Sequence, residues 1–159
     1  KLTDKVCLGY GTALALARSN DLIPHDDDID LIIAMPIAEY HSIAKAIPVV
    51  EQCLQQHGFS TVGSYVSHRH IRNPKGRSLD IFVGIEEGDF FSSFPGPRRT
   101  IRTTDLFPTG IVEIYGHQCR VPRDLDAYLS KVYGSTWKEP DPNFAHNWDR
   151  KPFADLLGV

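Results

Sequence analysis

The acidic run at residues 26–30 constrains this chain more than any other feature. Four of its five residues are aspartates, and the run leads directly into an apolar stretch that is typical of a buried strand. Side chains alternate between the two faces of a strand. Asp26, Asp28 and Asp30 would therefore share one face, while the residues between them would point into a core.

Carboxylates that follow each other along one strand face lie roughly 7 Å apart and repel each other. A hard divalent cation such as Mg²⁺ neutralises such a set, because it binds one or two carboxylates together with phosphate oxygens and water. The alternative is an acidic loop or helix N-terminus whose charges lie in solvent. Because Asp30 opens an apolar run, we favour a metal site that includes Asp28 and Asp30.

A further carboxylate lies in the middle of a second apolar run, Leu79-Asp80-Ile81-Phe82-Val83. Burying a charged side chain is costly unless it is paired or binds a metal. Asp80 could occupy an ordinary half-exposed strand face. Taken with the acidic run, it is better interpreted as a third metal ligand or as a general base.

Gly11 and Thr12 come just before an Ala- and Leu-rich segment, residues 13–19, that predicts a helix with Thr12 as its N-cap. Backbone N–H groups at a helix start bind phosphate, and glycine permits close approach. The pair is a weak signal alone, and it gains weight from its place before the acidic run.

The remaining pattern predicts a single domain, residues 1–159, of class α/β (α+β) with a mixed sheet flanked by helices. We expect a strand at 28–34, helices at 37–47 and 48–57, a strand at 59–71 paired in a hairpin with 77–85, a second hairpin at 111–115 and 118–121, and a helix at 124–133. Residues 86–109 lack a sustained period, which predicts a long functional or mobile loop. The segment from Trp137 onward is expected to lie across the domain.

Composition excludes several classes of function. A net charge of −3 argues against a bulk nucleic-acid binder. No apolar run approaches the ~18 residues of a membrane span, so membrane association is not indicated. The three cysteines lack the spacing of a disulfide framework or zinc knuckle. We therefore expect a reducing, cytoplasmic setting.

Basic residues gather at Arg69, Arg72, Lys75 and Arg77 and again at Arg98, Arg99 and Arg102. Basic clusters together with the acidic run favour binding of a metal and a phosphorylated small molecule.

Three features together resemble the pattern of the nucleotidyltransferase superfamily. They are a Gly-Thr pair before a helix, an Asp-x-Asp strand and a later strand with one Asp. In detail the chain resembles the LicD/fukutin family of phosphotransferases, whose pattern is roughly GTLLGxxR, a spacer and IPWDDDID. The matching blocks are Tyr10-Gly11-Thr12-Ala13-Leu14-Ala15-Leu16-Ala17-Arg18, Leu22-Ile23-Pro24-His25-Asp26-Asp27-Asp28-Ile29-Asp30, Leu79-Asp80-Ile81-Phe82, Val121-Pro122, Tyr128-Leu129 and Tyr133-Gly134-Ser135-Thr136-Trp137. His25 replaces the family's usual Trp and Ala15 a common Gly, and neither change removes a carboxylate.

The resemblance implies transfer of a phosphorylated alcohol, such as phosphocholine or ribitol phosphate, from a CDP-activated donor to a hydroxyl of a glycan acceptor. Asp28, Asp30 and Asp80 would be the catalytic residues and would hold Mg²⁺ or Mn²⁺. Asp80 would either complete the metal site or accept the proton of the acceptor. The donor would be bound by Gly11, Thr12, Arg18 and Asp26.

Other interpretations remain open. The chain could be a nucleotidyltransferase that acts on a small molecule, or a non-catalytic nucleotide-binding module. Arg18 could instead form a surface salt bridge with Asp21 or Asp26. His68 and His70 share one face of their predicted strand, and such a pair can bind metal, although exposed strand histidines more often have no special role.

Overall fold

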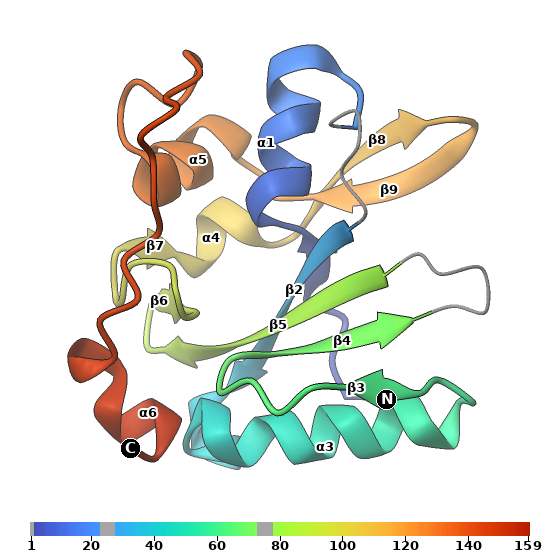
Figure 1. Ribbon diagram of the computed structural model, residues 1–159, viewed down its shortest axis with the longest axis vertical. Coiled ribbons are helices and arrows are strands. Elements are labelled where there is room, and N and C mark those ends of the chain that lie inside the picture. Colours follow the sequence, from blue (N-terminus) through green and yellow to red (C-terminus); the bar gives the residue numbers. More distant parts are fainter. Residues whose placement is uncertain (1, 23–27, 73–77) are drawn as a thin grey trace.

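The computed structural model describes residues 2–22, 28–72 and 78–159. Its elements are β1 (Val6–Leu8), α1 (Tyr10–Ser19), β2 (Asp28–Pro36), α2 (Ile37–Tyr40), α3 (Ile43–Gln56), β3 (Thr61–Val62), β4 (His68–Arg72), β5 (Ser78–Glu87), β6 (Phe90–Ser92), β7 (Ile101–Arg102), α4 (Thr103–Leu106), β8 (Gly110–Ile114), β9 (His117–Val121), α5 (Leu125–Tyr133), a 3₁₀ turn (Lys151–Phe153) and α6 (Ala154–Leu157). Figure 1 shows a central sheet with α3 and α6 on one side and α1, α4 and α5 on the other.

The central sheet is mixed, as the sequence predicts. Its strands follow the order β1-β2-β5-β4-β3, and β6 and β7 extend it beside β5. The neighbours β2 and β5 are parallel, and the other pairs are antiparallel. A separate two-stranded ribbon is formed by β8 and β9. The mixed sheet and its flanking helices confirm the predicted fold class.

Strand alternation assigns the two faces of the sheet to two cores. Odd-numbered residues of β2 and β5, such as Ile33 and Val83, pack with α3 and α6. Even-numbered residues further along the same strands, such as Ile32 and Phe82, pack with α1 and α5. The even-numbered positions at the start of these strands are Asp28, Asp30, Ser78 and Asp80. One face therefore carries a hydrophobic core at one end and the carboxylates at the other.

The helices after β2 differ from the prediction. The boundary expected at Pro48 is absent, and Pro48 lies inside α3. The chain breaks earlier, because His41 adopts a left-handed conformation (φ 62°) and Ser42 accepts a hydrogen bond from the backbone N–H of Lys45 as N-cap. Gly58 (φ 83°) follows the end of α3, where a left-handed glycine commonly ends a helix. The strand predicted at 59–71 is two short strands, β3 and β4, separated by residues without regular structure.

Residues 86–109 do not form the long irregular loop that the sequence predicts. They contain the end of β5, the strands β6 and β7 and the one-turn helix α4. Phe91, Phe94 and Leu106 are almost fully buried in the two cores. These side chains reach the core from separate short elements, so their spacing shows no helical or strand period.

The C-terminal segment runs from α5 on one side of the sheet to α6 on the other (Figure 1). Two arginines attach it to the domain. Arg18 donates to the carbonyls of Trp137 (2.8 Å) and Glu139 (2.9 Å). Arg98 donates to the carbonyl of Pro152 (2.6 Å). The segment thus lies across the domain, as expected.

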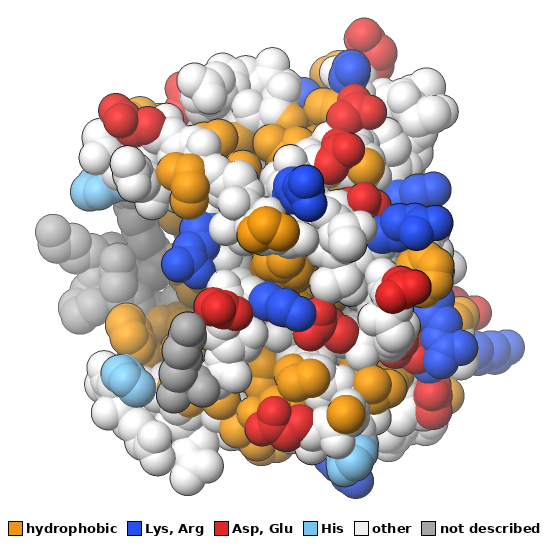
Figure 2. Space-filling model, turned by 180° about the vertical axis from the view of Figure 1, so that it is seen from behind, with side chains coloured by type: hydrophobic (Ala, Val, Ile, Leu, Met, Phe, Trp, Pro, Cys, Tyr) orange, Lys and Arg blue, Asp and Glu red, His pale blue; other side chains and the backbone are white. Residues whose placement is uncertain are grey.

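The surface carries charges of both signs, as the small net charge of the sequence indicates. Figure 2 shows Lys and Arg interspersed with Asp and Glu on the face opposite to that of Figure 1, without a continuous basic surface. Among the described residues, no helix combines the length and the apolar character needed to cross a bilayer.

Candidate active site

The parallel pairing of β2 and β5 brings the predicted carboxylates together. Asp30 is the register partner of Asp80, and Asp28 is the partner of Ser78. Neighbouring strands lie ~4.8 Å apart and register partners point to the same face. Asp28, Asp30 and Asp80 therefore form one group, which we call the carboxylate row. Asp28 accepts a hydrogen bond from the Ser78 hydroxyl. Asp26 lies outside the described residues.

The start of α1 lies directly on Asp30. The backbone N–H of Gly9 donates to the Asp30 carbonyl (2.9 Å), and the Asp30 N–H donates to Thr12 Oγ1 (2.8 Å). Thr12 N–H in turn faces Asp30 Oδ2 at 3.4 Å. A side chain at Gly11 would place its Cβ 3.1 Å from that same oxygen, so this position has little room for a larger residue.

Thr12 is therefore not the N-cap that the sequence predicts. The helix begins at Tyr10, and its N-cap is Gly9. Tyr10 has φ 37°, and its N–H donates to the buried Tyr128 hydroxyl at 3.0 Å. Because this contact comes from α5, the earlier helix start depends on tertiary packing. Gly11 and Thr12 remain beside the carboxylate row, and their binding of a phosphate stays a prediction.

Replacing Thr12 with valine is expected to lower the free energy of unfolding by about 1–3 kcal/mol, because it leaves the N–H of Asp30 without its hydroxyl acceptor. Thr12 is only 2% exposed, so water would not easily take the place of that hydroxyl. Urea denaturation measures the change, with Thr12→Ser, which keeps the hydroxyl, as the control. Equal stability of Thr12→Val and wild type would show that this hydrogen bond does not stabilise the fold.

Asp80 is bonded to a histidine that sequence analysis did not connect to it. The antiparallel pairing of β4 with β5 places His70 opposite Asp80, and His70 Nδ1 contacts Asp80 Oδ1. Burial raises the pKa of Asp80, the bond with His70 opposes this, and the charge of Asp28 adds to the increase. The predicted hairpin was the available signal, because it pairs the strand of His70 with that of Asp80.

His68 lies next along the same face of β4, opposite Phe82. It is 6% exposed. Burial, together with the nearby charges of His70 and Arg69, lowers the pKa of His68 to about 4. The ring is therefore neutral near pH 7. The prediction that the two histidines share a strand face is confirmed, and both lie beside Asp80.

The arginines considered for donor binding have protein partners. Arg18 bonds to the C-terminal segment rather than to Asp21, whose carboxylate accepts from Tyr115. Arg98 and Arg99 both pair with the buried Glu87. The binding of a diphosphate by Arg18 remains a prediction that these contacts do not test.

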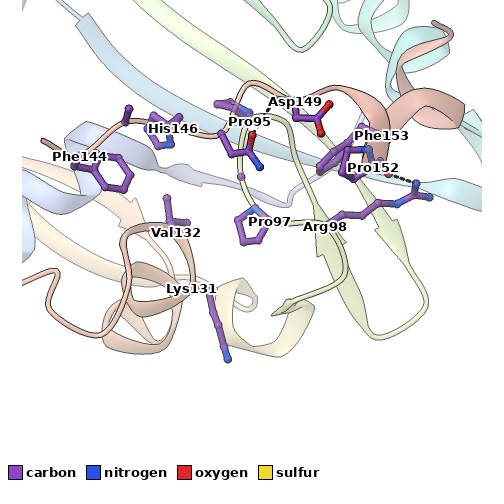
Figure 3. Close-up of a pocket in the computed structure, with 13 residues that line it drawn as sticks. Pro95, Pro97, Arg98, Lys131, Val132, Phe144, His146, Asp149, Pro152 and Phe153 are labelled. Atoms are coloured by element: carbon purple, nitrogen blue, oxygen red, sulfur yellow. Dashed lines mark hydrogen bonds between the residues drawn. The ribbon is translucent and has the colours of Figure 1, made fainter.

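Three cavities of the described residues lie near the C-terminal segment or near β4. One of about 280 Å³ lies under the C-terminal segment and is lined by His146, Arg98 and Phe153 among others (Figure 3). None of the three carboxylates lines it. A cavity of about 500 Å³ is lined by Tyr65 and His68, and a third of about 210 Å³ by Tyr65, His70 and Ser78. None of the three carboxylates lines these two cavities either; one reaches His68, and the other reaches His70 and Ser78, the register partner of Asp28.

A family model described as the LicD/FKTN/FKRP nucleotidyltransferase domain matches residues 4–124. No curated protein matches the chain.

Two solved structures of ANT(2'')-Ia are similar to this chain. The solution structure of this antibiotic-resistance factor is 15% identical, with a TM-score of 0.48, over 74% of this chain and 55% of that one. The crystal structure of ANT(2'')-Ia in complex with adenylyl-2''-tobramycin is 16% identical, with a TM-score of 0.47, over 74% of this chain and 58% of that one. The chain thus spans little more than half the length of the protein in either structure.

Proposed function

The chain belongs to the LicD/FKTN/FKRP nucleotidyltransferase-domain family, and we propose that it transfers a phosphorylated alcohol from a CDP-activated donor to a hydroxyl of a glycan, with the help of Mg²⁺. The family supports a transferase. The identities of the donor, the acceptor and the metal go beyond the family match and are what we propose.

The observation that carries the proposal is the carboxylate row. Asp30 and Asp80 are register partners on adjacent parallel strands, and Asp28 lies on the same face. Three carboxylates on one face of adjacent strands repel each other unless a cation neutralises them. Their oxygens are the ligands that Mg²⁺ prefers, so the residues present fit this metal.

Asp28, Asp30 and Asp80 would hold the metal. When bound, it would neutralise the charge of the donor diphosphate, the main requirement of phosphoryl transfer. Thr12 fixes the backbone of Asp30 by its hydrogen bond, and Gly11 leaves space beside the Asp30 carboxylate. Asp80 also bonds to His70, so this pair could accept the proton of the attacking hydroxyl.

A thermal-shift panel tests the proposal on the purified chain. The ligands are CDP-choline, CDP-ribitol, CDP-glycerol and nucleoside triphosphates, each with Mg²⁺ and with EDTA. We expect at least one CDP-linked compound to raise the melting temperature with Mg²⁺ only, because a ligand that binds the native state stabilises it by mass action.

Stabilisation by triphosphates alone would contradict the proposal and favour a nucleotidyltransferase that acts on a small molecule. Stabilisation that is equal with Mg²⁺ and with EDTA would contradict the metal requirement. Asp28→Asn should remove the Mg²⁺-dependent stabilisation, and Asp89→Asn, at an exposed position of the turn between β5 and β6, is the control for the added asparagine.

A further inference from the structure

Two histidines and one aspartate form a compact cluster at the edge of the carboxylate row. His68 and His70 are two residues apart on β4, so both point to the face that carries Asp80. Each of the three side chains offers one ligand atom, and these atoms all lie within 4.8 Å of one another. No other group of three such residues in the described part of the chain meets this condition.

The ligand types in this cluster differ from those of the carboxylate row. Imidazole nitrogens suit Zn²⁺ and similar transition metals, whereas Mg²⁺ prefers oxygen ligands and water. Two histidines with one carboxylate are a known ligand set for zinc, and three protein ligands leave a fourth position for water or a substrate oxygen. The cluster therefore has the composition of an open transition-metal site.

The surroundings hold the two imidazole rings in place. His68 Nδ1 lies 3.0 Å from Ser67 Oγ, a contact of the kind that orients metal-binding histidines from outside. The Tyr65 ring stacks on His68 at 4.4 Å between centroids and meets His70 edge-on at 4.9 Å. His68 also packs against Phe82. Rings held in this way need little rearrangement to bind a cation.

The cluster is accessible although His68 and Asp80 are each only 6% exposed. The cavity of about 500 Å³ reaches His68, and the cavity of about 210 Å³ reaches His70. Tyr65 lines both cavities. A small hydrated cation can therefore approach the two histidines through these cavities.

We propose that His68, His70 and Asp80 form a second cation site, selective for Zn²⁺ and similar transition metals, with a free coordination position toward the two cavities. The site shares Asp80 with the carboxylate row and differs from it in its two nitrogen ligands. It does not depend on the proposed transfer reaction.

Zinc titration of the metal-free full chain by isothermal calorimetry tests this proposal. The experiment uses a Cys53→Ser background, because Cys53 Sγ lies 3.9 Å from His57 Nδ1 on α3 and this pair could bind zinc itself. We expect one Zn²⁺ per chain. His68→Phe and His70→Asn should each weaken binding by more than the roughly 10- to 100-fold that loss of an outer partner costs.

Matched variants separate the two cation sites. Asp28→Asn should lower zinc affinity far less than either histidine variant does, while it removes Mg²⁺-dependent stabilisation by CDP-linked donors. His117→Asn, at an exposed position of β9, controls for the loss of a histidine. Circular dichroism checks the fold, and His70→Asn keeps the test valid if His68→Phe does not fold, because the His70 side chain is 27% exposed.

Absence of zinc binding would overturn the proposal, as would an affinity that neither histidine variant changes. Equal loss of zinc binding in Asp28→Asn would also overturn it, because the cation would then belong to the carboxylate row. These results are distinguishable from failure of the proposed function, which is a failure of CDP-linked donors to stabilise the chain with Mg²⁺.

Discussion

Replacing Asp30 with asparagine is expected to reduce transfer from the CDP-linked donor by roughly two orders of magnitude or more, the size of effect that loss of one essential catalytic group produces. Asparagine keeps the shape of the side chain and one oxygen that can face Thr12 N–H, so the start of α1 should remain in place. The charge of the carboxylate is what the variant removes. The assay is transfer of the labelled alcohol phosphate to the acceptor at saturating Mg²⁺.

The same variant should fold normally. Loss of one carboxylate relieves the repulsion with Asp28 and Asp80, so the melting temperature without metal should not fall. Asp89→Asn is the matched control and should keep full activity. If Asp30→Asn were as active as the control, the carboxylate row would not be the catalytic centre.

Replacing Glu87 with glutamine is expected to destabilise the fold by about 3 kcal/mol, because it breaks a buried ion pair and leaves Arg98 with less compensating charge. The Glu87 side chain is 2% exposed and pairs with both Arg98 and Arg99. Arg98 also bonds to Pro152 and Asp155 in the C-terminal segment. The variant should therefore loosen this segment as well.

Urea denaturation and hydrogen exchange of residues 137–155 measure the two effects. Asp155→Asn is the matched control, because it removes the other carboxylate partner of Arg98. The Asp155 side chain is 65% exposed, so its removal should cost less than about 1 kcal/mol. Equal costs for the two variants would show that the burial of Glu87 does not strengthen its pair.

The Glu87 pair also predicts a pH dependence. Burial acts to raise the pKa of Glu87, but the bonds from Arg98, Ser92 and Arg99 outweigh it and lower the pKa below its ordinary value of 4.5. The pair therefore stabilises the fold fully above pH 4.5 and loses this contribution as the pH falls through the lower pKa of the folded state. The difference in stability between wild type and Glu87→Gln should shrink in that acidic range.

The carboxylate row was largely predictable from local pattern. Alternation in an apolar run placed Asp28 and Asp30 on one face, and the strand around Asp80 was equally readable. The pairs of residues that lie opposite each other on β2 and β5 were not predictable, because the register of these strands joins residues fifty positions apart. The link between His70 and Asp80 required the register of β4 and β5 in the same way.

Two differences from the prediction originate in contacts between distant segments. The N-cap of α1 is Gly9 and not Thr12, and the Tyr128 hydroxyl of α5 accepts the Tyr10 N–H at the start of this helix. The stretch 86–109 contains short strands and a helical turn, and its Phe91, Phe94 and Leu106 pack in two cores assembled from other elements. Hydrophobic periodicity is a local property of the sequence, so it does not reveal which distant residues pack together.

The sequence by itself determined the types of side chain on each strand face, the family and the presence of three candidate metal-binding aspartates, because alternation and motif spacing are local properties. Only the tertiary structure decided that Asp30 faces Asp80, that Thr12 supports Asp30 and that His68 and His70 join Asp80 in one cluster. The physical reason is that strand register and helix docking are set by burial of the whole chain, and each depends on residues far away in the sequence.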